Sequence, residues 1–348
     1  MVSKDVTLVH LKIKEEPTAD GKVSQSISGV DYHRLYTPYK RIIDQGGRVQ
    51  FFGWEKDDDG NTLGYEMLKQ FDLSNVKNLV IGRFAQLTNH KAFKKWLRDR
   101  DVRLIVDNDD YWELQSDNPA REYYRKVAAP NIISCIEIAD VITTPSQYLR
   151  DKMSEIRTDA EFVVIHNALD PDSENWSWQS GYEKDFSEAK FGYVGALGHK
   201  KDLQTMSVDW TPYNLNVVDL GTYPQMLNAK STMPVENIFQ YGNQYKEFNI
   251  SLCPVKSNVF TRCKSPLKVA EAVYTDTAVI ATDATPYREF IEDGKTGLLC
   301  KHHLDWRKKV KMLHESPSMA EDLVEASKDK WKKFFHIDTQ NELRKQIL

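Results

Sequence analysis

Short apolar runs alternate with amphipathic helical stretches along this chain, and the alternation occurs twice. This alternation is typical of α/β folds, in which crossover helices join parallel strands. The first series ends near residue 165, and a polar, turn-rich segment from Asn167 to about Glu188 separates it from the second. The pattern therefore predicts two doubly wound, Rossmann-like domains that face a ligand-binding cleft.

Each series contains six predicted strands. The strands are Val6–Leu11, Arg48–Phe52, Asn78–Ile81, Arg103–Val106, Val141–Thr143 and Phe162–Ile165, and then Phe191–Val194, Leu215–Val218, Ile238–Tyr241, Ser251–Pro254, Ala278–Ala281 and Gly297–Cys300. The helices predicted in the first half are Tyr32–Gln45, Leu63–Phe71, His90–Arg98, Pro119–Ile138 and Tyr148–Ile156. We predict an N-terminal domain over 1–170, a linker over 171–189, a C-terminal domain over 190–317 and helices over 318–348.

Composition excludes several classes of protein. A length of 348 residues with 41% hydrophobic residues suits two ordinary cores, and a net charge of -4 argues against a globally basic nucleic-acid coat. No apolar run approaches the roughly 18–20 residues that cross a bilayer, and no signal-peptide pattern follows the N-terminus. The four cysteines lack CxxC spacing, so we expect reduced thiols and a cytoplasmic protein.

The stretch from Asn258 to Ala272 predicts an anion site at a helix start. Ser265 suits the N-cap and Pro266 the first helical position, and unpaired N–H groups at such a start bind anions. The nearby cations are Arg262, Lys264 and Lys268, and Glu271 follows Lys264 by seven residues, on nearly the same helix face. On the local pattern alone, a capped surface helix with solvated charges is the simpler explanation.

The sequence after this stretch, from Thr277 to Leu299, favours the anion site over the capped surface helix. A strand at Thr277–Thr282, a loop from Asp283 and a glycine turn at Glu292–Leu299 closely resemble the C-terminal signature of GT-B glycosyltransferases, "EAxAxGxPVIAT…ELIxDGxxGLL". The resemblance implies two Rossmann-like domains, a C-terminal helix that crosses back to the first, and a ribose-binding role for Glu271. The first glutamate of the family's usual pair falls at Cys263, and the line instead resembles a KSxLKxxEA variant.

A second block resembles the first strand and loop of the GT-B nucleotide domain. Phe191–Leu203 reads as a strand, a glycine-rich loop and a helix, in which Gly195 and Gly198 allow backbone to approach a phosphate. Lys200 or Lys201 can act as a point charge, and His199 with Asp202 fits the variant's GxxxHxxD form. The family's usual Gly-Arg is Gly195-Ala196 here, so one phosphate ligand of the family is missing.

Weaker resemblances lie in the first half. Ala139–Leu149 is similar to the family line "ADxVxxxSxxL", and Val164–Asp170 is similar to "VIPNGVD". The segment Gly29–Leu35 resembles the loop that faces donor and acceptor. We therefore assign acceptor binding to Gly29, His33 and Arg34.

The acidic segment after the Arg103–Val106 strand has three interpretations. Asp107, Asp109 and Asp110 could bind a metal as a DxD motif, act as general base or acceptor contact, or cap the next helix. A metal-binding DxD motif fits two Rossmann-like domains poorly. A role as base or acceptor contact and a role as helix cap explain the pattern equally well. We predict Asp110, with Asp109, as catalytic and Asp107 as acceptor-binding, and we predict no metal.

The function expected from these features is sugar transfer from a nucleotide-diphosphate donor, a UDP-sugar, to a hydroxyl acceptor without a cofactor. Lys200, Lys264, Arg262 and the helix start at Ser265 would stabilise the leaving diphosphate. A basic, aromatic helix at 90–100 and a resemblance to tailed-phage enzymes favour 5-hydroxymethylcytosine in duplex DNA as acceptor, in the host cytoplasm. The alternatives are a surface-polysaccharide or lipid-linked transferase and an inactive sugar-nucleotide-binding module.

Overall fold

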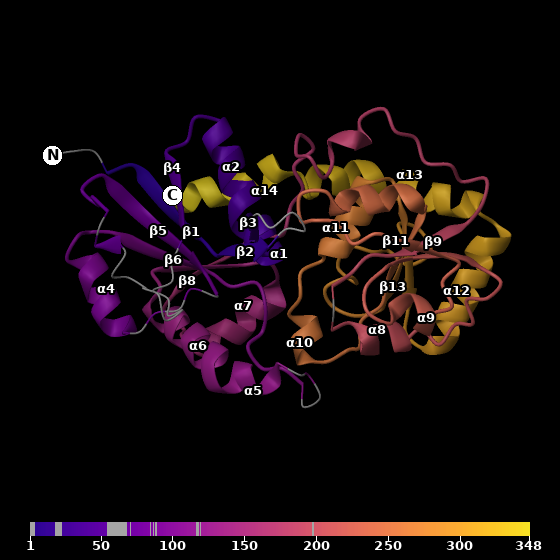
Figure 1. Ribbon diagram of the computed structural model, residues 1–348, viewed down its shortest axis with the longest axis horizontal. Coiled ribbons are helices and arrows are strands. Elements are labelled where there is room, and N and C mark those ends of the chain that lie inside the picture. The colour runs from indigo at the N-terminus through magenta and orange to yellow at the C-terminus, as the bar shows by residue number, and fades with distance from the viewer. Residues whose placement is uncertain are drawn as a thin grey trace. The chain divides into compact units, whose positions relative to one another are not determined.

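A computed structural model describes residues 4–17, 23–53, 68–69, 71–83, 85, 87, 89–115, 118, 120–196 and 198–348. The chain divides into two compact units. Unit 1 comprises residues 1–166 and 340–348, and unit 2 comprises residues 167–339. Each unit is built around a six-stranded parallel sheet (Figure 1).

The sheet of unit 1 has the order β4-β1-β5-β6-β7-β8. All five strand pairings are parallel, as expected for strands joined by crossover helices. An antiparallel hairpin of β2 (Ile13–Pro17) and β3 (Val23–Ile27) follows β1. The sheet strands are β1 (Val6–Leu11), β4 (Val49–Gly53), β5 (Val76–Gly82), β6 (Arg103–Asp107), β7 (Val141–Thr144) and β8 (Glu161–Val164).

Helices cover the sheet of unit 1, and two of them contain a π-helical turn. The first runs without a break through α1 (Gly29–Asp31), the π segment Tyr32–Tyr36 and α2 (Thr37–Asp44). The second runs through α5 (Arg121–Tyr123), the π segment Tyr124–Ala128 and α6 (Ala129–Ile138). The remaining helices are α4 (His90–Arg98), α7 (Gln147–Ser154) and α14 (Ile337–Ile347), of which α14 begins in unit 2.

The end of the chain completes the core of unit 1. Ile347 is 4% exposed and packs in one apolar cluster with Val9, Leu35 and Ile105. Two side chains from the sheet bind the last carbonyls of the chain, because Asn78 Nδ2 donates to Leu348 O (2.9 Å) and Arg103 Nη1 to Ile347 O (3.1 Å). The last two residues, more than 200 positions away in sequence, therefore pack against this sheet and bind it.

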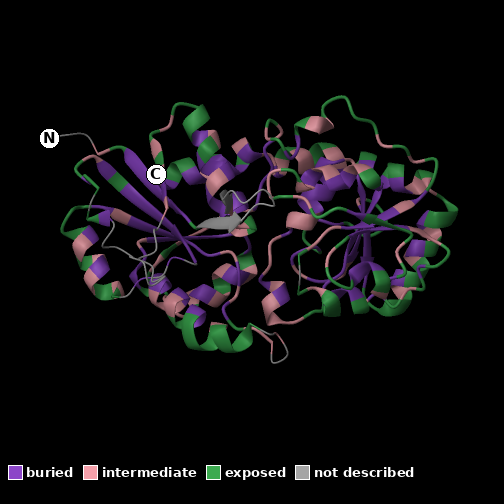
Figure 2. Ribbon diagram, viewed as in Figure 1, coloured by how far each residue is buried: buried purple, intermediate pink, exposed green. Residues whose placement is uncertain are grey.

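The sheet of unit 2 has the order β11-β10-β9-β12-β13-β14, again with parallel pairings. Counted within the unit, this is the strand order 3-2-1-4-5-6 of dinucleotide-binding folds. The strands are almost wholly buried (Figure 2). Their bounds are β9 (Lys190–Tyr193), β10 (Asn214–Val218), β11 (Ser231–Met233), β12 (Ile250–Cys253), β13 (Ala278–Thr282) and β14 (Leu298–Cys300).

Two apolar clusters cover the faces of this sheet. One of them contains Trp176 from the segment predicted as a linker, so residues near 176 pack with unit 2. The helices are α8 (Lys200–Gln204), α9 (Tyr223–Met226), α10 (Val259–Arg262), α11 (Leu267–Tyr274), α12 (His303–Glu315) and α13 (Ser318–Phe334), with 3₁₀ turns at Ser177–Gln179 and Tyr241–Glu247.

The structure confirms the α/β prediction, with two sheets of six strands and a C-terminal helix that returns to the first. The strand predicted at Ile238–Tyr241 is wrong. Asn237 closes a turn there, since its Oδ1 accepts from Phe239 N (2.8 Å) and its carbonyl from Gln240 N (3.0 Å). The edge strand is the shorter β11 instead. Most of the helix predicted at Leu63–Phe71 lies outside the described residues.

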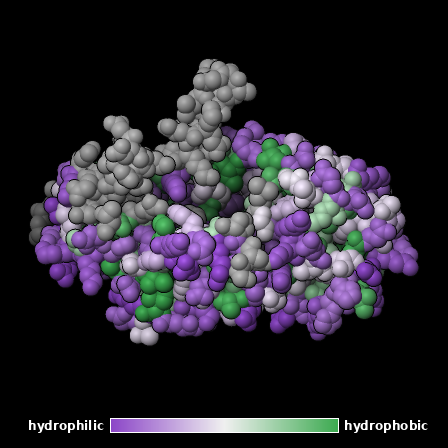
Figure 3. Space-filling view, turned by 60° about the horizontal axis from the view of Figure 1, so that its bottom comes forward, coloured by the Kyte–Doolittle hydropathy of each residue, from purple (hydrophilic) through white to green (hydrophobic). Residues whose placement is uncertain are grey.

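The face of the molecule in Figure 3 is mainly hydrophilic, and its hydrophobic side chains form separate small groups. Among the described residues, no helix combines the length and the apolar character that a membrane span requires.

We predict that Ile347→Ala lowers the free energy of unfolding of unit 1 by about 2–4 kcal/mol, because it leaves a cavity in the cluster that the end of the chain seals. Chemical unfolding measures this loss. Lys345→Ala, at an exposed position on the same helix, is the matched control. Equal stability of the two variants would contradict the role given to the C-terminal residues.

Candidate functional site

The strand order of unit 2 places a ligand-binding point between β9 and β12. These two strands are neighbours, yet the chain continues from β9 to β10 on the other side. Loops that leave the carboxyl ends of such a pair diverge to opposite sides, and ligands of open α/β sheets bind in the space between them. The two loops here are residues 194–199 and 254–266, which contain both of the sequence blocks that predicted a phosphate site.

The first loop depends on its two glycines for different reasons. Gly198 has φ +104°, a conformation that residues with a side chain rarely adopt. Gly195 is restricted by space, since an added Cβ would lie 2.5 Å from Tyr193 Oη and 3.1 Å from Lys268 Nζ. The backbone therefore passes directly over a buried tyrosine and a lysine.

Asp202 connects the two loops. Its Oδ2 lies 2.7 Å from Nδ1 of His199, and its Oδ1 accepts a hydrogen bond from Lys256 N at 2.7 Å. The loop is also fixed at its backbone, because His199 N donates to Tyr223 Oη (2.9 Å) and that hydroxyl donates to Ala196 O (3.2 Å). Burial lowers the pKa of His199 and the bond to Asp202 opposes this effect.

Lysine side chains lie on both sides of the first loop. Lys268 donates from Nζ to Val194 O, and the same ammonium lies 4.8 Å from the centre of the Tyr193 ring. Burial lowers the pKa of Lys268. Lys264 is half-buried with its ammonium 4.5 Å from the centre of the Phe260 ring, whereas Lys200 is exposed. Together they supply positive charge near the loop.

The start of α11 differs from the prediction. Pro266 rather than Ser265 occupies the N-cap, and the carbonyl of Pro266 accepts from Val269 N and Ala270 N. The Ser265 hydroxyl does not cap the helix and instead accepts a hydrogen bond from Asn167 Nδ2 at 3.2 Å. Arg262 lies half-buried on the short preceding helix α10, which Asn258 caps. The helix therefore begins one residue later than the Ser-Pro pattern indicates.

Glu271 is 4% exposed on α11, and two tyrosines bind its carboxylate. Tyr241 Oη donates to Oε1 at 2.5 Å, and Tyr245 Oη donates to Oε2 at 2.7 Å. Burial raises the pKa of Glu271, while the two hydroxyl donors and Lys268 act in the opposite direction. Sequence reasoning missed both tyrosines. Tyr241 was placed at the end of the predicted strand Ile238–Tyr241, and the bonds to Glu271 join residues 26 and 30 positions apart.

In unit 1, two of the predicted acceptor residues form an ion pair with each other. Arg34 donates to both carboxylate oxygens of Asp107, at 2.9 and 2.7 Å, and also to Ile165 O at 2.6 Å. Thr143 Oγ1 donates a third hydrogen bond, at 2.6 Å, to the same carboxylate. Both charged side chains are buried, and they join the π segment Tyr32–Tyr36 to strands β6 and β7. This arrangement gives the pair a structural role.

The other predicted acceptor residues lie close to this pair in sequence and differ in exposure. His33 is buried, and this burial lowers its pKa to about 3, so the imidazole is neutral at pH 7. Gly29 is exposed at the start of α1.

Asp109 and Asp110 share one buried arginine that the sequence did not single out. Arg83 Nε lies 2.8 Å from Asp109 Oδ1, and Arg83 Nη1 lies 3.3 Å from Asp110 Oδ2. Burial raises the pKa of Asp109, and Arg83 opposes the rise. Among the described residues, no three His, Cys, Asp or Glu side chains gather closely enough to form a metal site.

Asp31 is a third carboxylate at this edge that sequence reasoning missed. It lies at the end of α1, and its Oδ2 accepts from Lys12 N at 3.0 Å, directly after β1. Burial raises its pKa to about 6, and the nearby charge of Asp109 adds to the rise. The only sequence signal was its place in the Gly29–Leu35 segment.

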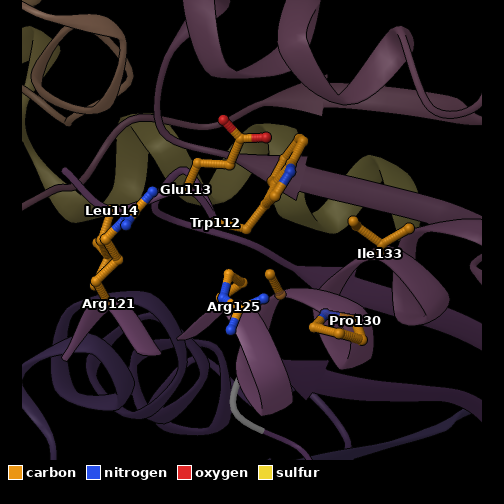
Figure 4. A pocket seen from close by; sticks show the side chains of 8 residues that line it. Trp112, Glu113, Leu114, Arg121, Arg125, Pro130 and Ile133 are labelled. Carbon is orange, nitrogen blue, oxygen red and sulfur yellow. The ribbon is translucent and has the colours of Figure 1, made fainter. Parts of the chain in front are cut away.

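A pocket of about 350 Å³ opens in unit 1 two residues beyond Asp110. Figure 4 shows Trp112 and Glu113 above the pocket, Arg121 at its left, Arg125 and Pro130 below it and Ile133 at its right. The pocket thus combines an aromatic and apolar wall with two arginines and the Glu113 carboxylate, and Arg125 also pairs with Glu122 at 2.9 Å.

Residues 217–330, which include Lys264, Lys268 and Glu271, match the family model described as "Glycosyl transferases group 1". A comparison with curated proteins finds no match. Similar solved structures include sucrose-phosphate synthase from Thermosynechococcus elongatus, with TM-score 0.68, 11% identity and 98% of each chain covered. A glycosyltransferase from Rickettsia africae has TM-score 0.62 and 12% identity, over 99% of this chain and 97% of the other.

HepE from Anabaena, solved in complex with UDP-glucose, is also similar, with TM-score 0.61 and 12% identity over 98% of this chain and 99% of that one. At these identities the structures establish the fold, which is GT-B. The family match over residues 217–330 adds a glycosyltransferase signature within unit 2.

We predict that Asp31→Asn changes how stability depends on pH. The pKa of Asp31 is higher in the fold, about 6, than its ordinary value of 3.8, so the fold favours the protonated form. Its contribution is complete below pH 4 and is lost as the pH rises through 6. The variant is neutral at every pH, so between pH 4 and 7 its stability relative to wild type should increase by up to about 3 kcal/mol.

Chemical unfolding at pH 4.5, 5.5 and 7 measures this difference. Asp322→Asn, at an exposed position, is the control and should show no such trend. A constant difference between Asp31→Asn and wild type across the three pH values would rule out the raised pKa.

Proposed function

We propose that this chain transfers a sugar from a UDP-sugar to a hydroxyl group of its acceptor, with the donor bound to unit 2. The proposal rests on one observation, the convergence of the glycine loop, two half-buried lysines and the Glu271 carboxylate at the β9–β12 point. The HepE structures in complex with UDP and with UDP-glucose share the fold and support UDP as the nucleotide.

In this proposal the diphosphate lies against the backbone of Gly195, Ala196, Gly198 and His199. Lys264, Lys268, Arg262 and Lys200 provide positive charge around it. Ser265 Oγ already accepts a hydrogen bond from Asn167, so its own hydroxyl hydrogen can be donated to a phosphate oxygen. Glu271 accepts hydrogen bonds from the two ribose hydroxyls.

The reaction breaks the bond between the sugar's anomeric carbon and the diphosphate oxygen and forms a bond from that carbon to the acceptor oxygen. Negative charge grows on the diphosphate as the bond breaks, so cations beside it lower the barrier. The acceptor hydroxyl loses its proton, and a carboxylate of unit 1 is the proposed base. Asp109 and Asp31, whose pKa values are raised, suit this role better than a fully solvated carboxylate.

We predict that Glu271→Ala weakens UDP binding by roughly ten- to hundredfold, since a hydrogen bond to a charged group contributes about 1.5–3 kcal/mol. Isothermal titration calorimetry with UDP measures the change. Glu247→Ala, at an exposed position of the same unit, serves as the control. If folded Glu271→Ala binds UDP as wild type does, the ribose assignment is wrong.

For the acceptor we propose 5-hydroxymethylcytosine in duplex DNA. The pocket beyond Asp110 supports this choice, because an aromatic wall suits a base taken out of the stack and Arg121 with Arg125 suits the flanking phosphates. A second hollow, of about 680 Å³, gathers further cations and aromatic rings at the opposite edge of the sheet. It is lined by Lys4, Lys69, Phe71, Asp72, Leu73, Ser74, Trp96 and Arg100.

Not all of the basic face predicted on α4 is open to a partner. Lys94 pairs with Asp140 at 2.5 Å and Lys95 with Asp99 at 2.6 Å, while the Arg100 guanidinium stacks 4.5 Å from the Trp96 ring. DNA affinity is therefore expected to be modest and to fall as salt rises. The free cysteines, all buried, support a cytoplasmic location.

We predict that the protein adds a sugar to DNA that contains 5-hydroxymethylcytosine and leaves unmodified DNA unchanged. The assay incubates both DNAs with a panel of UDP-sugars and detects hexose or pentose additions on nucleosides by mass spectrometry. Arg121→Glu should reduce labelling severalfold, whereas Arg288→Glu, on an exposed loop of unit 2, should not. Release of UDP without any labelled DNA would overturn this acceptor and favour the surface-polysaccharide alternative.

A further inference from the structure

The two tyrosines that bind Glu271 belong to a buried assembly built on one side of α11. Tyr245 is 1% exposed and Tyr241 is half-buried, and the Trp176 ring packs edge-on against both, with ring centres 5.6 Å from Tyr241 and 6.1 Å from Tyr245. Each of the two tyrosine hydroxyls donates to a different oxygen of the Glu271 carboxylate. Such a pairing fixes the plane of the Glu271 carboxylate.

The backbone that carries the tyrosines is itself fixed. Gly242, between them, donates from N to Asn175 Oδ1 at 3.0 Å, and Asn175 Nδ2 donates to Ile238 O at 2.7 Å. An added Cβ at Gly242 would lie 2.4 Å from Asn175 O, so the segment approaches Asn175 as closely as a glycine allows. The positions of the two hydroxyls therefore depend on the fold and not on flexible side chains.

A carboxylate has about four acceptor positions, two on each oxygen. The tyrosines use one on each oxygen and leave one on each, which matches the two hydroxyls of a ribose. Burial disfavours the charged form of Glu271, and hydrogen bonds donated to the carboxylate favour it. The two phenols thus keep a buried group both oriented and able to accept.

We propose that Tyr241 and Tyr245 are positioning residues for Glu271 and that they set the preference of the site for ribose over 2′-deoxyribose nucleotides. This inference rests on the proposed function, since it assigns the ribose to Glu271. Neither tyrosine contacts the nucleotide in this account. Their effect reaches the ligand through the carboxylate alone, so it should be confined to the hydroxyls that the carboxylate binds.

The test measures affinity for UDP and for 2′-deoxy-UDP by isothermal titration calorimetry. Tyr245→Phe removes one hydroxyl with little change in shape. Tyr241→Phe is the second variant, and because Tyr241 is less buried, losing its hydroxyl should disturb folding less. Tyr213→Phe, in another part of unit 2, is the matched control. Each variant is compared at one pH, with its melting temperature measured in parallel.

Each tyrosine variant should lose about five- to tenfold in UDP affinity and a clearly smaller factor in 2′-deoxy-UDP affinity, because 2′-deoxy-UDP keeps only the 3′-hydroxyl for Glu271, so that the preference for ribose narrows. The control should retain the wild-type preference. Equal losses for the two nucleotides, or unchanged preference in both folded variants, would overturn the inference and leave a packing role only. Failure of the proposed function looks different, because wild type itself would then bind UDP no better than 2′-deoxy-UDP.

Discussion

Asp202 holds together the two loops between which the donor site is formed. Loops that leave adjacent strands in opposite directions have no backbone pairing of their own, so their separation must be set by side chains. One carboxylate does this by binding His199 on the first loop and the Lys256 N–H of the second. The glycine backbone, Lys268 and α11 take their positions relative to this connection, and the chemistry proposed for unit 2 depends on it.

The two units use buried charge in different ways. In unit 1, Arg34 and Asp107 satisfy each other and join a helix to the sheet, and the single Arg83 pairs with both Asp109 and Asp110. In unit 2, Lys268 donates to a carbonyl and lies against a ring, and the charges near it act at longer range, so its ammonium can still attract a phosphate. Cations thus surround the proposed diphosphate site of unit 2, and in unit 1 two carboxylates share one arginine.

The sequence was informative wherever local pattern decides structure. Strand periodicity predicted most of the twelve sheet strands, and the glycine loop and the α11 block were found from residue spacing. Local rules were less reliable at turns, since Ser265 precedes the N-cap and the Ile238–Tyr241 run, despite its apolar ends, is turned by Asn237. The hairpin β2–β3 was not predicted.

Long-range partners could not be found from the sequence. The bonds from Tyr241 and Tyr245 to Glu271, from Arg83 to Asp109, and from Asn78 to the C-terminal residue join positions that no periodicity relates. These long-range bonds decide which candidate residues are used within the fold and which can bind a ligand. The acceptor, for the same reason, has to be argued from pockets and charge.

The structure of the complex with UDP tests the central claim most directly. We expect the ribose hydroxyls within hydrogen-bond distance, about 2.5–3.2 Å, of both Glu271 carboxylate oxygens, with the diphosphate over Gly195, Gly198 and His199 and beside Lys264. UDP bound elsewhere, or bound there with its ribose turned away from Glu271, would contradict the account.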